Sequence, residues 1–184
     1  YRVVKKMRWQ PEIRIAGQNA DNGLYIQALV NSVKRHLELV DFNPDAILSS
    51  YHGIPKIYLR KGDPYSCFCY KTHRLLSEGL KLQNIEIENH ISFQSRFGPK
   101  EWLRPYTADV LRELVKKGVK NLIVITPGFS ADCIETLEEV DIEYRKLFLE
   151  LGGKNFSLVP CLNHSDDGIA LIKDLLEANL WRRK

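Results

Sequence analysis

Residues 121–139 read NLIVITPGFSADCIETLEE and give the clearest indication of the fold class. Its first part, residues 121–126, is the most apolar of the strand-like runs and predicts a buried, central strand. The Pro127-Gly128 pair then predicts a turn. Residues 131–151 continue as a predicted helix, which ends at Gly152-Gly153. A strand that passes through a turn into a helix is typical of a parallel α/β sheet.

The rest of the chain repeats this alternation. Short apolar runs predict further strands at residues 12–15, 45–50, 88–94 and 156–160. Apolar residues at helical spacing predict helices at residues 1–9, 24–39, 65–80, 104–117 and 166–181. The pattern implies a single α/β domain over residues 1–184, with a mostly parallel sheet flanked by helices in three layers.

The composition is ordinary for a globular protein, with 44% hydrophobic and 27% charged residues. No apolar run approaches the ~20 residues of a membrane-spanning helix, and no signal peptide is visible. The chain begins at Tyr1 without Met, so we expect a fragment or a processed product. The net charge of +4 comes partly from terminal Lys and Arg residues, which we interpret as solvated; a nucleic-acid partner is therefore not expected.

The four cysteines do not follow the spacing of a metal site. Cys67 and Cys69 are separated by one residue, whereas zinc sites use pairs separated by at least two. Cys133 and Cys161 lie far along the chain. We expect reduced thiols in a cytoplasmic protein, and no metal or cluster on these residues.

In a parallel sheet, ligands bind outside the carboxyl ends of the strands. One segment that follows a strand holds His52, whose imidazole can accept a proton or bind a metal near neutral pH. The alternative is a histidine that only hydrogen-bonds to loop backbone. A second segment holds Trp102 among two arginines and a lysine, which suits a planar ligand with carboxylates. The alternative there is a loop that Trp102 anchors under its helix.

The helix after the central strand carries carboxylates on one face. Glu135, Glu139 and Glu143 are four residues apart and stack along that face. Like charges at this spacing cost roughly a few tenths of a kcal/mol per pair, which suggests that they meet a cation. The alternative is a solvated acidic face, with Glu143 paired to Lys146. The opposite, apolar side is predicted to pack inward: Ile134, Leu137, Val140, Tyr144, Leu147, Phe148 and Leu151.

Together these segments resemble the ferrochelatase family. The resemblance rests on motifs in matching order and spacing: LSSYHGIP at 48–55, GDPY at 62–65, FQSRFGP at 93–99, WLRPYT at 102–107 and PGFSADCIETLEE at 127–139. It extends from about residue 11 to the last helix. Several independent motifs of this length are more specific than one short motif.

The resemblance implies a chelatase-like, flavodoxin-like sandwich with a four-stranded sheet. It also implies insertion of Fe²⁺ into protoporphyrin IX to form haem, the last step of haem biosynthesis, by a cytoplasmic bacterial enzyme of the lyase class. Ferrous iron and porphyrin would be its substrates, and no prosthetic group is expected. The resemblance leaves two points open: whether the substrate is protoporphyrin or coproporphyrin, and whether the enzyme associates peripherally with a membrane.

On the family's pattern, His52 and Glu135 face each other as the catalytic pair and the metal ligands. Glu139 and Glu143 would continue the acidic row as a relay for metal or protons. The porphyrin would contact Tyr51, Trp102, Phe129 and Ser130. Such groups suit the chemistry, because two pyrrole protons must leave as the metal enters. The iron also exchanges its water for carboxylate and imidazole ligands.

The chain resembles only the C-terminal of two similar halves between which the porphyrin lies. The N-terminal half would supply the opposite wall of the pocket, so we expect the catalytic pair in an incomplete cleft and no activity from this chain alone. Some relatives carry an iron–sulfur cluster on a C-terminal extension, and none is expected here. The alternative from another class is a non-catalytic tetrapyrrole- or metal-binding module.

Overall fold

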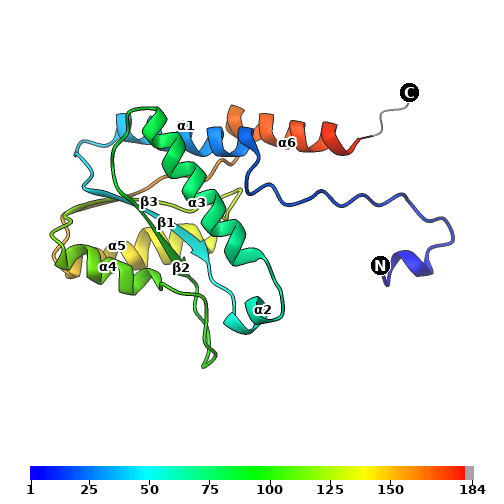
Figure 1. Cartoon of the computed structure of the whole chain (residues 1–184), viewed down its shortest axis with the longest axis horizontal. Coiled ribbons are helices and arrows are strands. Elements are labelled where there is room, and N and C mark those ends of the chain that lie inside the picture. Colours follow the sequence, from blue (N-terminus) through cyan, green and yellow to red (C-terminus); the bar gives the residue numbers. More distant parts are fainter. Residues whose placement is uncertain (181–184) are drawn as a thin grey trace.

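A single four-stranded sheet organises the protein, whose residues 1–180 we describe from a computed structural model (Figure 1). The strands lie in the order β2-β1-β3-β4, and every neighbouring pair is parallel. The predicted α/β fold with four strands is therefore confirmed, and the sheet is wholly parallel. The strands are β1 (Ala46–His52), β2 (Asn89–Gln94), β3 (Asn121–Ile125) and β4 (Asn155–Leu158).

Helices cover both faces of the sheet (Figure 1). On one face lie α1 (Gly23–Leu39) and α3 (Tyr65–Leu82), with α6 (Asp166–Asn179) packed on α1. On the other lie α4 (Thr107–Lys116), the π-helix η2 (Glu135–Tyr144) and α5 (Arg145–Glu150), which continues it. The short helices η1 (Val4–Lys6) and α2 (Lys56–Arg60) complete the set.

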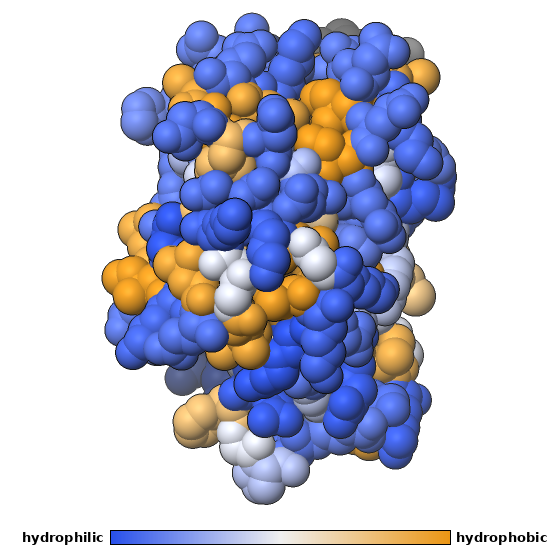
Figure 2. Space-filling view, turned by 90° about the vertical axis from the view of Figure 1, so that its left-hand side faces the viewer, coloured by the Kyte–Doolittle hydropathy of each residue, from blue (hydrophilic) through white to orange (hydrophobic). Residues whose placement is uncertain are grey.

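The central strands serve two cores because successive side chains point to opposite faces. Ile47 and Ile123 pack against α1 and α3, whereas Leu48 and Val124 pack against α4 and α5. All four side chains are buried, which explains why these strands read as continuous apolar runs. Figure 2, which faces the left-hand side of Figure 1, shows a mostly hydrophilic surface with separate apolar patches.

Two N-terminal predictions are wrong. Residues 12–15 form no strand, and of residues 1–9 only the turn Val4–Lys6 is helical. The segment runs as an extended arm along α6, where the Arg14 guanidinium donates to the Asn179 carbonyl at 2.6 Å. Ile13 and Ile15 are 48% and 73% exposed, so their alternating apolar pattern has no sheet partner to bury it.

The acidic helix also differs from its prediction. It begins at Glu135 rather than at residue 131, because Asp132 is held in the preceding loop by Asn163. Its first ten residues are π-helical, with wider turns than the 3.6-residue spacing assumed from the sequence. Ile134 and Leu137, assigned to the packing face, are accordingly 67% and 52% exposed.

Other boundaries shift by a few residues. The helix predicted at 104–117 begins at Thr107, after the cis Arg104–Pro105 bond. The helix predicted at 166–181 ends at Asn179, and residue 181 lies outside the described residues. Lys146 lies 3.9 Å from the Glu150 carboxylate instead of pairing with Glu143.

Candidate functional site

The imidazole of His52 lies at the carboxyl end of β1, where the strand gives way to the HGIP turn. Its Nδ1 lies 2.6 Å from the Gly53 carbonyl oxygen, which can only accept, so Nδ1 carries the proton in the neutral ring. The lone pair then lies on Nε2. The Tyr65 hydroxyl of the GDPY motif donates to the His52 carbonyl at 2.8 Å and fixes the backbone beneath the ring.

Two aromatic rings flank this imidazole. The Trp102 ring centroid lies 6.5 Å from that of His52, and the Phe129 centroid lies 6.3 Å from it. Trp102 is held by its Nε1 donating to the Phe97 carbonyl at 2.9 Å and by a bridge to Pro55. Residues from three strand ends, far apart in sequence, therefore line one partly exposed apolar wall around a base.

Glu135, the first residue of η2, lies at the same edge and is partly exposed. A hydrogen bond from the Cys133 thiol, followed by one from its own backbone N–H, holds the pKa of the Glu135 carboxyl below its usual value of 4.5. Desolvation opposes this shift, and the charge of His52 makes the smallest contribution to it. Glu135 is thus a carboxylate at neutral pH, within electrostatic reach of the imidazole. Sequence reasoning missed the contribution of Cys133, although that cysteine lies within the quoted motif.

The loop before η2 is fixed by a reciprocal pair. Asn163 Nδ2 donates to Asp132 Oδ2 at 2.7 Å, and the Asp132 N–H donates to Asn163 Oδ1 at 2.9 Å. Asp132 also accepts from the Cys161 N–H and the Thr136 hydroxyl, each at 3.2 Å. Burial raises the pKa of Asp132, but these hydrogen bonds outweigh it and lower the pKa overall. The pair joins the loop after β4 to the loop before η2, and it thereby fixes the point at which the helix begins, Glu135.

Glu139 follows Glu135 on η2 but faces protein donors. Its Oε1 accepts from the Ser95 N–H at 2.6 Å and the Tyr144 hydroxyl at 2.9 Å. Its Oε2 accepts from the Ser95 hydroxyl at 2.5 Å and from Gln94 Nε2 at 3.3 Å. Sequence reasoning marked the 94–102 segment as a site but did not foresee this contact.

The other predicted site residues do not all lie at the same surface as His52. Tyr51 is 2% exposed and packs with Phe93, Cys69 and Leu103, behind the wall that carries His52. Ser130 is exposed in the loop beside Phe129. Glu143 is exposed farther along η2. The structure thus gathers His52, Trp102, Phe129 and Glu135, and does not bring Tyr51 or Glu143 to the same surface.

Among residues 1–180, no group of three or more His, Cys, Asp or Glu side chains is arranged to hold a metal ion. Across the same residues, none of the helices combines the length and hydropathy needed to cross a bilayer.

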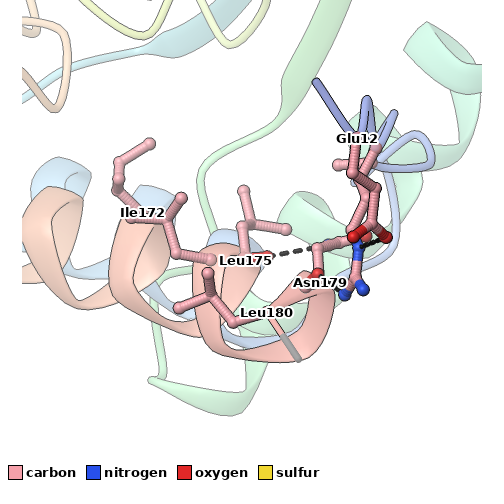
Figure 3. Close-up of a pocket in the computed structure, with 8 residues that line it drawn as sticks. Glu12, Ile172, Leu175, Asn179 and Leu180 are labelled. Carbon is pink, nitrogen blue, oxygen red and sulfur yellow. Dashed lines mark hydrogen bonds and ion pairs between the residues drawn. The ribbon is translucent and has the colours of Figure 1, made fainter. Parts of the chain in front are cut away.

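A cavity of about 400 Å³ lies between the N-terminal arm and α6, where Ile172, Leu175 and Leu180 line it (Figure 3). None of the predicted site residues lines that cavity.

Comparison with known proteins identifies the family of the chain. The family model described as ferrochelatase matches residues 1–180. The ferrochelatases of Francisella tularensis subspecies tularensis, mediasiatica and novicida are each 47% identical to the chain over 184 residues. These matches cover all of the chain and 55% of each relative, so the chain spans about half the length of the curated relatives it matches. Because the matched region contains every motif that builds this edge of the sheet, the chain belongs to the ferrochelatase family.

Proposed function

We propose that the chain is the metal-inserting half of an enzyme that places Fe²⁺ into protoporphyrin IX to form haem. The observation that carries the proposal is the meeting of a base, a carboxylate and two aromatic rings at one edge of the sheet, contributed by His52, Glu135, Trp102 and Phe129. Membership of the ferrochelatase family supports the choice of reaction.

In this proposal His52 accepts protons from the porphyrin. The hydrogen bond between Nδ1 and the Gly53 carbonyl leaves Nε2 free to act as base in the neutral ring. Two pyrrole N–H protons leave as one Fe²⁺ enters, so the metalled ring is neutral and two protons pass to the protein and solvent. A base beside the ring centre speeds such a transfer.

Glu135 complements this base. Its lowered pKa keeps the carboxyl ionised at neutral pH, so that it attracts the incoming cation and stabilises the protonated imidazole. Imidazole and carboxylate together replace part of the water around the iron. Trp102 and Phe129 offer apolar faces to the macrocycle, and the exposed Ser130 follows Phe129 in the same loop.

In this proposal Tyr51 and Glu143 have more specific roles than the sequence suggested. Tyr51 supports the pocket from behind, because its ring packs against Phe93 under the wall. The relay role of the acidic row remains a prediction for the exposed Glu143, which is accessible to ions. The cytoplasmic location and the absence of a prosthetic group or iron–sulfur cluster also remain predictions.

The test is iron insertion by the full-length enzyme carrying His52→Ala or Glu135→Gln. Each change is expected to reduce haem formation at least 100-fold, on the order expected for loss of a general base. Unfolding midpoints should stay close to those of the parent protein, since both side chains are partly exposed. Near-parental activity in both variants would reject the assignment.

We further propose that activity requires the N-terminal half. The 184-residue chain alone should bind a porphyrin weakly and form no haem, because only one wall of the cleft is present. Absorbance titration with protoporphyrin, followed by addition of Fe²⁺ under anaerobic conditions, measures both properties. Haem formation by the isolated chain would contradict this, and binding that persists without turnover even in the full-length enzyme would favour the non-catalytic tetrapyrrole-binding module.

A further inference from the structure

The carboxylate of Glu139 is saturated by protein donors. Four donors, from Gln94, from Tyr144 and twice from Ser95, lie 2.5–3.3 Å from its two oxygens. An ionised carboxylate offers about four lone-pair sites, so these contacts occupy them. A metal ion or a migrating proton would have to displace a hydrogen bond to use this group.

Three of the four donors come from the end of β2, and they also control the chain there. Ser95 adopts φ 62°, a left-handed conformation that is uncommon for a residue with a side chain. Its N–H and hydroxyl both bond to Glu139, and charge-assisted bonds of this kind are stronger than neutral ones. Glu139 therefore stabilises a backbone conformation that Ser95 would not favour by itself.

Gln94 extends the same network to the backbone of both candidate catalytic residues. Its backbone pairs with His52 in the sheet, and its carbonyl accepts from the Gly53 N–H at 2.9 Å. Its side chain is 1% exposed, and Nε2 donates to the Glu135 carbonyl oxygen at 2.8 Å. Gln94 Oε1 accepts from the Ser50 hydroxyl at 2.8 Å. One buried amide thus connects the strand of His52 to the first turn of the Glu135 helix.

Tyr144 closes the network from the far end of η2. Burial, followed by the charge of Glu139, raises the pKa of Tyr144, so its hydroxyl stays neutral and donates. The contact spans five residues within the π-helix and holds the Glu139 side chain toward Ser95.

We propose that Glu139, acting through Gln94 and Ser95, is a positioning residue that fixes Glu135 relative to His52, and not a relay for metal or protons. The kinetic part of its test rests on the proposed function, whereas the spectroscopic part does not.

The spectroscopic test follows the side-chain carboxyl carbon of Glu135 by NMR in the 184-residue chain during a pH titration. Removing a neighbouring negative charge alone would lower the pKa of Glu135 further. Loss of positioning would instead raise it toward 4.5, because the carboxylate moves from Cys133 and His52. We therefore expect Glu139→Gln to raise the pKa of Glu135, and the exposed, matched Glu143→Gln not to raise it.

A second variant guards against loss of folding. Ser95→Ala removes the hydroxyl bond and keeps the backbone bond to Glu139, so it should shift the pKa of Glu135 in the same direction by less. An unchanged or lowered pKa of Glu135 in both the Gln and the Ala variant would overturn the proposal.

The kinetic test compares Glu139→Gln with Glu138→Gln, which changes an exposed glutamate of the same helix, in the full-length enzyme. A positioning role predicts a roughly 10- to 100-fold lower kcat for Glu139→Gln, with the KM for iron within about twofold of the parent, and little effect of Glu138→Gln. A relay role predicts a raised KM for iron in Glu139→Gln, and that result would refute positioning. If the parent enzyme inserts no iron, the proposed function fails while the NMR result still decides the role of Glu139.

Discussion

At the scale of single residues, the backbones of β1 and β2 approach each other closely at Gly53, beside the candidate site. A Cβ atom at this position would lie 2.7 Å from the Gln94 carbonyl oxygen and 3.2 Å from Trp102 Cε3. The same carbonyl accepts the Gly53 N–H, so the two strand ends are joined where they are closest. The glycine of the HGIP motif is thus required by packing between β1 and β2, and not by a positive φ.

We predict that Gly53→Ala destabilises the protein by about 1–3 kcal/mol, as overpacking typically does. The clash is with backbone oxygen and an anchored indole, neither of which can move without disturbing His52. Gly128→Ala is the matched control in the neighbouring turn, since its Cβ would meet atoms only at 3.6 Å or beyond. Urea unfolding of both variants measures the difference, and equal midpoints would contradict this reading.

At the scale of elements, the sequence predicted those helices and strands whose apolar residues repeat at a regular spacing. The buried strands and the amphipathic helices α1, α3 and α4 were found to within a few residues, because their apolar residues repeat at the spacing of the structure they form. The strand at 12–15 was not, because alternation cannot reveal whether a neighbouring strand exists. The π-helix was missed because its wider turns change which residues share a face.

The candidate site was likewise predictable from the sequence only in part. His52, Trp102, Phe129 and Glu135 could be placed together because strand ends in a parallel sheet meet at one edge. The role of Glu139 could not be foreseen, since it depends on the side-chain hydrogen bonds of Gln94 and Ser95 across a loop. A helical wheel records the direction of a carboxylate and not the donors that it meets.

Two helices carry half-buried histidines that should make stability depend on pH. Burial lowers the pKa of His36 on α1, and burial together with His90 lowers that of His73 on α3. The unfolded chain therefore binds protons first as the pH falls below 6.5, so the free energy of unfolding should drop there and level off below the folded pKa values.

The measurement is urea unfolding between about pH 7.5 and pH 5.5, the range in which histidine titrates. His36→Gln and His73→Gln should each reduce the loss of stability over this range. His164→Gln, which changes an exposed histidine, should leave the loss as in the parent. A parental pH dependence in both buried-site variants would show that other groups cause it.

At the scale of the whole molecule, α6 is apolar on two sides. Leu171 is 5% exposed and packs toward α1, whereas Ile172, Leu176 and Leu180 are 52%, 56% and 63% exposed on the side of the arm. Such a helix is typical of a buried position. These three exposed side chains line the cavity between α6 and the N-terminal arm.

We predict unequal effects of truncating the two sides of α6 in the 184-residue chain. Leu171→Ala should cost about 2–5 kcal/mol, as for a buried leucine, and Leu176→Ala less than about 0.5 kcal/mol, as for an exposed one. Thermal melts followed by circular dichroism, with light scattering to report association, make the comparison. A large cost for Leu176→Ala would show that the exposed side is covered in solution.

The pairing of His52 with Gln94 in the sheet bears on which changes in length the protein can survive. Inserting or deleting one residue within β1 would turn every following side chain to the opposite face, so the imidazole and the Ser50 hydroxyl would exchange places with their neighbours. The turn around Asn84, between α3 and β2, is exposed and carries none of the motifs that build the site. Related genes should therefore gain and lose codons between α3 and β2, while the number of codons from Ile47 to Gly53 stays constant.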